Sequence, residues 1–266
     1  MMLEIENLSI TSKKETLVKN LTMSIDSGEW FALVGESGSG KSLTASAIGG
    51  LLPSNLSIKS GSIRVCNQDT VNMKIRQRFL GNTITYIFQD YSGAFTPFLK
   101  IGAQLDEVLK AHTSWSRSER RVAVEEALRK VKLPETVYEK YPLQLSGGQL
   151  QRAAIASAMM LKPSLLIADE PTTALDALTA QHVLTLIHEL ASEAGCAVLF
   201  ITHDLRHVKK HATRVGVLKE GTLVETGTKK EVFTNPKHPY TNMLLRSIPD
   251  LKSETTRLIT SEYDAL

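Results

Sequence analysis

The chain has 266 residues, of which 42% are hydrophobic and 22% are charged, a balance that is ordinary for a globular protein. It carries 31 Lys and Arg against 28 Asp and Glu, and this near-balance argues against a nucleic-acid partner. The apolar runs fall far short of the roughly 20 residues that span a membrane, the first residues lack a signal-peptide pattern, and the two cysteines form neither a disulfide framework nor a zinc pattern.

The first part of the chain is predicted to form a mixed sheet with one helix. Alternating or continuous apolar residues predict strands. A helix is expected from Leu43 to Gly49. The predicted strands cover residues 3–10, 21–25, 29–34, 61–67 and 83–88.

The residues between the third strand and this helix fit the phosphate-binding pattern G-x-x-x-x-G-K-[ST]. They are Gly35, Glu36, Ser37, Gly38, Ser39, Gly40, Lys41 and Ser42. Glycines let the backbone approach a phosphate, and successive N–H groups meet it at the positive end of the helix dipole. Lys41 is expected to bind the β- and γ-phosphates, and the Ser42 hydroxyl is expected to bind Mg²⁺.

After residue 89 the pattern changes to helical. Helical periodicity covers Ile101–Ala111, and a capping box at Ser116–Glu119 precedes a second helix. A third helix is predicted over Gly147–Leu161. Residues 90–160 are therefore predicted to be a helical insertion between sheet elements.

The last third returns to alternating strands and helices. Buried strands are predicted over Ser164–Asp169 and Ala197–Thr202, joined by a helix over Ala177–Ala194. The final predicted elements are a hairpin over 215–218 and 222–225, a short helix after a second capping box at 228–231, and a polar tail over 251–266.

Two further motifs carry the predicted chemistry. Asp169 ends a buried strand and Glu170 follows it, which suits a Mg²⁺ ligand and a carboxylate that polarises an attacking water. Leu145–Gln149 places a serine and two glycines at a helix start, which makes a second anion site. Since one ATP does not need two cradles, this second site is predicted to act on nucleotide bound by another subunit. Its members are Ser146, Gly147, Gly148 and Gln149.

In this order the motifs resemble those of the ATP-binding-cassette (ABC) ATPases. In that family Gly35–Ser42 is the Walker A loop, Leu165–Asp169 the Walker B strand and Leu145–Gln149 the signature. The resemblance implies an α/β P-loop NTPase fold with a RecA-like core, an antiparallel β subdomain and an α-helical signature subdomain. Residues 1–250 would form this ATPase domain.

The resemblance also implies roles for individual residues. Glu170 corresponds to the catalytic carboxylate and His203 to the switch histidine near the γ-phosphate. Gln89 corresponds to the glutamine that links Mg²⁺ to the helical subdomain, so that Ser42, Gln89 and Asp169 would hold the metal. Asp176, in Ala174-Leu175-Asp176, corresponds to the D-loop aspartate of the dimer interface.

Two stretches, Phe88–Pro97 and Asn235–Thr241, are similar to segments of peptide and nickel importers. The implied function is the ATPase subunit of a bacterial importer of peptides, nickel or metal chelates. Its partners would be a second, non-identical ATPase, two transmembrane permeases and an extracytoplasmic substrate-binding protein, at the cytoplasmic face of the inner membrane. An exporter subunit and a non-transport ATPase acting on DNA or ribosomes are the alternatives.

Two features depart from or add to the family pattern. No aromatic residue occurs before Trp30, although the family stacks adenine on an aromatic near the position of Ser12. Leu17 or Val18 is the expected apolar substitute. His207 and His211 stand at helical spacing, and a solvated helix face is favoured over a metal site because a third ligand is missing.

Overall fold

The computed structural model describes residues 1–71, 78–173 and 175–247. The predicted tail, residues 251–266, and Ala174 of the predicted D-loop lie outside these ranges. Within them, none of the helices combines the length and the apolar character that a lipid bilayer requires.

A six-stranded sheet forms the centre of the fold, in the order β10-β9-β3-β8-β7-β6. Its strands run parallel except for β10, which forms an antiparallel hairpin with β9. The strand bounds are β3 Trp30–Val34, β6 Ile84–Ile87, β7 Leu165–Asp169, β8 Ala197–Ile201, β9 Arg214–Lys219 and β10 Thr222–Thr228. The predicted α/β class is confirmed.

A second sheet of four strands is antiparallel, in the order β2-β1-β4-β5. Its strands are β1 Leu3–Thr11, β2 Thr16–Ile25, β4 Ser57–Val65 and β5 Gln68–Asp69. The strand predicted at residues 61–67 is placed too late. β4 begins at Ser57, which pairs with Thr11, and it ends at Val65 because Cys66 and Asn67 adopt positive φ angles of 50° and 61° and turn the chain.

Helices cover both faces of the central sheet. Buried residues alternate along each strand, so that Phe31 and Leu33 face one core while Trp30 and Ala32 face the other. The first core joins the sheet to α1 and the four-stranded sheet, and the second joins it to the remaining helices. The helices are α1 Lys41–Gly49, α3 Ile101–His112, α4 Arg117–Lys130, α5 Gly147–Met159, α6 Ala177–Ala194, α7 Leu205–His211, α8 Lys229–Thr234 and α9 Pro239–Arg246, with short 3-10 turns at Glu135–Glu139 and Pro142–Gln144.

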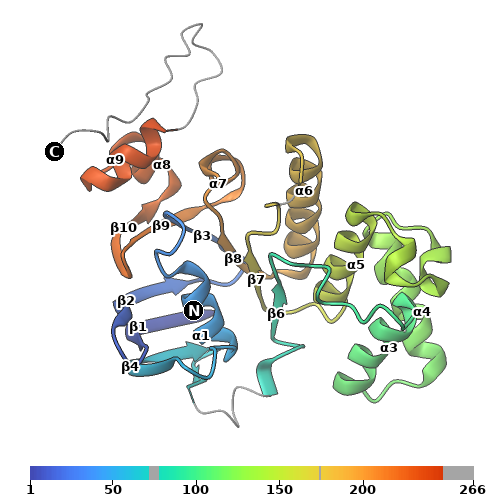
Figure 1. Cartoon of the computed structure of the whole chain (residues 1–266). Helices are drawn as coiled ribbons and strands as arrows, with labels where there is room; N and C mark the ends of the chain where they lie inside the picture. The colour runs from blue at the N-terminus through green and yellow to red at the C-terminus, as the bar shows by residue number, and fades with distance from the viewer. Residues whose placement is uncertain (72–77, 174, 248–266) are drawn as a thin grey trace, which may run out of the picture.

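The helices α3, α4 and α5 lie between β6 and β7 in the chain and form one side of the molecule (Figure 1). The four-stranded sheet lies on the opposite side. Capping boxes explain where α4 and α5 begin. The Ser116 and Ser146 hydroxyls each accept a hydrogen bond from the amide three residues on, and the side chains of Glu119 and Gln149 accept one from the Ser116 and Ser146 amides. The signature segment lies at the start of α5. In Figure 1 the central strands lie between this helix and α1.

Candidate functional site

The segment Gly35–Ser42 connects the end of β3 to the start of α1. Gly35 has a φ of 150°, and a side chain there would place its Cβ 2.1 Å from the carbonyl oxygen of Leu218. Gly40, with a φ of 105°, is the N-cap of α1 and offers no side chain to bond the first helical amides. These amides stay open to an anion, as a phosphate loop requires.

The side chain of Lys41 folds back onto the loop to which it belongs. Its Nζ donates to the carbonyl oxygens of Gly35, at 2.8 Å, and Glu36, at 2.7 Å. Burial lowers the pKa of Lys41, while the nearby carboxylates of Glu170 and Asp169 oppose this effect. Neutral carbonyl groups thus hold the ammonium group of Lys41, a residue that is only 5% exposed.

The end of β7 brings a carboxylate to this loop. The Ser42 hydroxyl donates to Asp169 Oδ1 at 3.0 Å, although the two residues are 127 positions apart. Burial raises the pKa of Asp169, and the hydrogen bond from Ser42 opposes that rise. A hydroxyl beside a carboxylate would supply oxygen ligands of the kind that Mg²⁺ prefers. These residues fit the predicted metal.

Glu170, directly after Asp169, has a φ of 45° and turns away from the strand. Its Oε2 accepts a hydrogen bond from Thr173 Oγ1 at 2.7 Å, and its Oε1 lies 3.2 Å from His203 Nδ1. Burial acts to raise the pKa of Glu170, but the hydrogen bonds from Thr173 and His203 outweigh burial and lower it. The side chain is therefore ionised at neutral pH, which a proton acceptor requires.

The predicted glutamine and signature meet at a separate hollow of about 490 Å³. Gln89 is exposed there, and Gly147 and Thr173 line the same hollow. Thr173 also bonds Glu170, so this hollow adjoins the carboxylate. Ser146 is exposed at the start of α5, with its hydroxyl bonded to the Gln149 amide at 3.3 Å.

Asp176 lies at the start of α6, where its side chain accepts hydrogen bonds from the amides of Leu178 and Thr179. These bonds make Asp176 the N-cap of α6. The hydrogen bond with the Thr179 side chain is the main cause that lowers the pKa of the Asp176 carboxyl, and the bonds from the two amides add to it. Its predicted role at a dimer interface stays a prediction.

Burial distinguishes between the two apolar residues that were predicted to contact adenine, Leu17 and Val18. Val18 is fully buried and packs beneath Gly40, so its proposed contact with adenine is wrong. Leu17, half-buried in β2 near Ser12, stays the predicted contact.

The predicted solvated histidine face is also wrong for His211. It is only 8% exposed and packs against Trp30 and His188, with ring centroids 5.9 Å and 5.8 Å away. Burial is the main cause that lowers the pKa of His211 to about 4, and charges on His188, Lys210, His207 and Lys229 add to it. The part of the chain that the structure describes holds no group of three or more potential His, Cys, Asp or Glu metal ligands.

Sequence reasoning missed three polar residues around the site. Thr173 holds Glu170, and Gln151, fully buried in α5, donates to the carbonyl of Pro171 just after the two carboxylates. Tyr240 accepts a hydrogen bond from the amide of Glu36. Gln151 stands near Gln149 and Arg152, before the apolar residues of α5 begin, so none of the three contacts has a local signal in the sequence.

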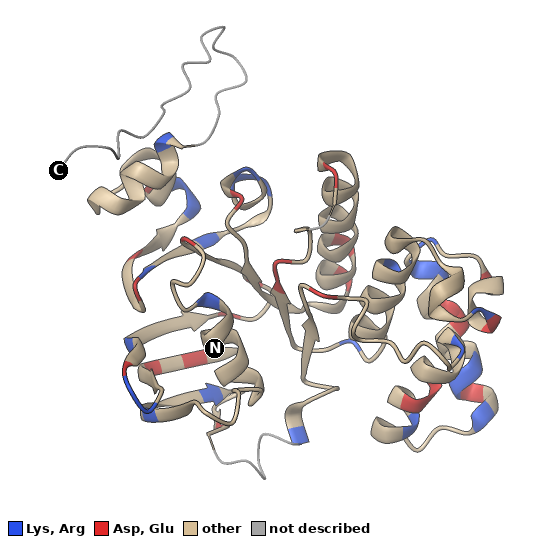
Figure 2. Cartoon of the chain, viewed as in Figure 1, with Lys and Arg blue, Asp and Glu red and all other residues tan. Residues whose placement is uncertain are grey.

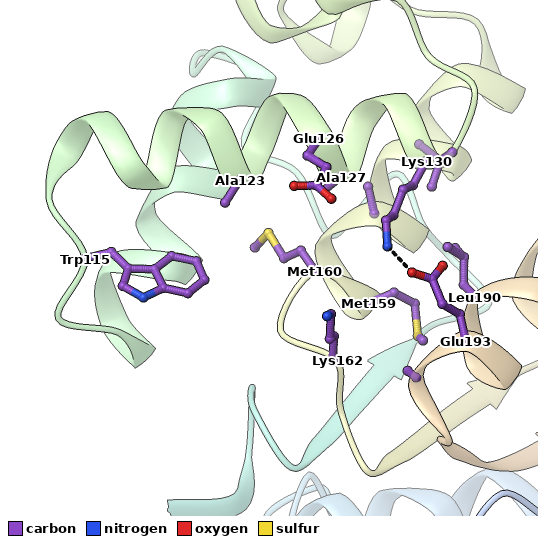
Figure 3. A pocket seen from close by; sticks show the side chains of 13 residues that line it. Trp115, Ala123, Glu126, Ala127, Lys130, Met159, Met160, Lys162, Leu190 and Glu193 are labelled. Atoms are coloured by element: carbon purple, nitrogen blue, oxygen red, sulfur yellow. Dashed lines mark hydrogen bonds and ion pairs between the residues drawn. The ribbon is translucent and has the colours of Figure 1, made fainter.

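A cavity of about 220 Å³ lies away from these residues, between α4, α5 and α6 (Figure 3). Trp115, Met159 and Met160 supply apolar walls, and Lys130 of α4 pairs with Glu193 of α6 across it. None of the predicted site residues lines this cavity.

Comparison with known families gives two matches along the chain. Residues 18–173 match the family described as ABC transporter, and residues 224–264 match the family described as oligopeptide/dipeptide transporter, C-terminal region. The second match includes α8 and α9 and extends beyond the described residues.

Relatives and solved structures agree with these matches. A protein of Brucella ovis named as a peptide import ATP-binding protein is 44% identical over 90% of this chain and 73% of its own length. The glutathione import ATP-binding protein of Escherichia coli K12 is 40% identical over 94% of this chain, which spans only 42% of that relative.

Among solved structures, an ATP-binding cassette in a dimeric post-hydrolysis state bound to ADP and Pi has a TM-score of 0.76 and 30% identity, covering 85% of this chain and 98% of that chain. CbiO1 of Clostridium perfringens, part of an ABC transporter complex, has a TM-score of 0.76 and 28% identity, covering 88% and 91%. These neighbours confirm the predicted cassette fold.

Proposed function

Because the chain belongs to the ABC transporter family, we propose that it is the ATP-hydrolysing subunit of an importer of peptide-class cargo. Membership makes it an ABC ATPase that binds ATP. The observation that carries the proposal at the site is the convergence of Ser42, Asp169, Glu170 and His203 beside the phosphate loop.

Each residue has a proposed task in hydrolysis. Within Gly35–Ser42, the open amides at the start of α1 and the Lys41 ammonium bind the phosphates. Ser42 and Asp169, with Gln89 as the proposed third ligand, would hold Mg²⁺, which would neutralise phosphate charge. Glu170 accepts the proton of the attacking water. His203 Nδ1 lies 3.2 Å from the Glu170 carboxylate, and we assign the contact with the γ-phosphate to this histidine.

The second cradle supports a head-to-tail dimer. Ser146 and Gly147 are exposed at the start of α5, and the half-buried Gly148 and Gln149 follow them. The central strands lie between α5 and α1 in Figure 1. We propose that they bind nucleotide held by a second, non-identical ATPase, with Asp176 at the interface. This arrangement is supported by the packing of the two helices that follow the two segments, because α1 packs in one core of the central sheet and α5 in the other.

Permease partners are supported by exposed apolar side chains in the α3–α5 region. Phe98 and Leu143 are 83% and 84% exposed, and the hydrogen bond from the Ile101 amide to the Lys140 carbonyl joins their two loops. Single exposed apolar residues are common, but two on adjoining loops suit a protein partner. Figure 2 shows Lys and Arg interspersed with Asp and Glu rather than gathered in one stripe, which does not favour a nucleic-acid partner.

The proposal includes the bounds of the ATPase domain and its location in the cell. We propose residues 1–250 as the ATPase domain, with the helical insertion over residues 90–160, attached to two permeases at the cytoplasmic face of the inner membrane. A substrate-binding protein would deliver cargo on the other side. The names of the relatives favour peptides or glutathione over nickel, and favour import over the exporter and non-transport alternatives.

The test is reconstitution of the chain with its permeases, partner ATPase and binding protein in vesicles. We expect ATP hydrolysis to rise with peptide-loaded binding protein and labelled peptide to accumulate inside. A matched assembly that carries Glu170→Gln should accumulate none. Accumulation of nickel alone, or efflux instead of uptake, would overturn the proposed cargo or direction.

A further inference from the structure

The C-terminal segment is anchored to the hairpin of the central sheet by one carboxylate. Glu225 of β10 accepts hydrogen bonds from the backbone amides of Lys237, at 2.8 Å, and His238, at 3.0 Å. His238 caps α9, and its Nδ1 accepts a hydrogen bond from the Tyr240 amide at 3.1 Å. These bonds fix the entry of α9 and leave little freedom for the first residues of that helix.

The anchored helix directs Tyr240 toward the phosphate loop. Tyr240 is only 5% exposed, and the ammonium group of Lys219 lies 5.3 Å from the centre of its ring. Its hydroxyl oxygen accepts a hydrogen bond from the Glu36 amide at 3.0 Å, across 204 positions of the sequence.

The Glu36 amide belongs to the same peptide group as the Gly35 carbonyl. That carbonyl accepts the hydrogen bond from Lys41 Nζ at 2.8 Å. In a planar trans peptide the N–H and C=O groups point in opposite directions. The peptide plane is therefore held from both sides, by Tyr240 on one and by Lys41 on the other.

We propose that Tyr240 is a positioning residue for ATP binding, which acts through the Gly35–Glu36 peptide to orient the Lys41 ammonium. This inference rests on the proposed role of Gly35–Ser42 as the ATP site. Fixing the peptide before nucleotide arrives lowers the entropy that binding has to remove, so preorganisation raises affinity. It also makes the C-terminal segment a part of the nucleotide site.

Tyr240→Phe tests this directly, because it keeps the ring and removes only the accepting oxygen. We expect the dissociation constants of the full chain for ATP and ADP to rise by about fivefold, the effect of one net hydrogen bond. In the reconstituted complex KM for ATP should rise to a similar extent while kcat is retained, because Glu170 is untouched.

Tyr138→Phe is the matched control, since it removes a hydroxyl from an aromatic ring in the helical region, where Arg121 packs on that ring. It should leave nucleotide affinity unchanged. Unchanged affinity in Tyr240→Phe, or an equal loss in both variants, would overturn the inference. Failure of the wild-type chain to bind ATP at all would instead overturn the proposed function.

A reciprocal measurement separates positioning from a general loss of stability. Coupling between two sites is mutual, so ATP binding should slow amide hydrogen exchange across Pro239–Arg246 in the wild type. In Tyr240→Phe this protection should be largely lost, although α9 is still anchored through Glu225. Equal protection in both proteins would contradict the coupling.

Discussion

Glu170→Gln is the sharpest test of the catalytic assignment, because the structure predicts what the variant keeps and what it loses. The amide has the same length, and its oxygen can accept the hydrogen bond that Thr173 Oγ1 now donates at 2.7 Å. The amide nitrogen can face His203 Nδ1, 3.2 Å from the present oxygen. The fold and the position of the side chain should therefore survive.

What the variant loses is the negative charge and the capacity to accept a proton. A positioned general base contributes about 10²–10⁴-fold to rate, so the activation free energy of hydrolysis should rise by about 2.7–5.4 kcal/mol. ATP affinity should be retained or improved, since a carboxylate near Lys41 no longer repels the phosphates. The ATP-bound dimer should accumulate.

The assay is phosphate release in a single turnover by the assembled complex, with ATP binding measured in parallel. Glu189→Gln, on the exposed face of α6, is the matched control and should behave as the wild type. Wild-type turnover in Glu170→Gln would refute the assignment of the base. Loss of ATP binding would refute the claim that its role is confined to the chemical step.

Three further outcomes are expected. Lys41→Ala should abolish tight ATP binding in direct titration, and unchanged affinity would contradict the phosphate-loop assignment. Ser146→Arg should leave ATP binding by the isolated chain nearly intact but stop turnover at the composite site built on the partner ATPase's phosphate loop; loss at the site built on this chain's own Lys41 would contradict action in trans. Because the pKa of His211 falls to about 4 in the fold, the unfolded chain takes up a proton first on acidification. The free energy of unfolding should therefore decrease as pH falls from about 6.5 toward 4, and His211→Phe should weaken this dependence in pH-resolved thermal unfolding; an unaltered dependence would contradict it.

Local patterns were sufficient to predict most of the elements. The apolar runs of β7 and β8 are buried on both faces, and the helix between them ends at Gly195 with a φ of 63°, as a left-handed C-cap requires. The capping boxes at Ser116 and Thr228 open helices as expected. These signals depend on neighbours within a few residues, which a single sequence contains.

Errors arose where a tertiary contact overrides the local pattern. His211 stands beside lysines and was expected in solvent, but the ring packs on Trp30 from a strand that lies far away in the sequence. Val18 was predicted to contact adenine, but its side chain packs against Gly40, in the space that a larger residue at that position would occupy. Polarity of sequence neighbours does not determine which face of a short element meets the core.

The contact between Glu36 and Tyr240 shows why the full nucleotide site could not be predicted from motifs alone. The phosphate pattern specifies which residues approach a phosphate, but it contains nothing about what holds the loop from behind. That support comes from α9, whose position depends on Glu225 in the middle of β10. The hairpin of β10 and β9 pairs in turn with β3 through β9. Each of these steps is a packing event between distant segments. The residues that approach the phosphates can thus be predicted from their spacing. The residues of the C-terminal region that hold this loop in place are defined only by the three-dimensional structure.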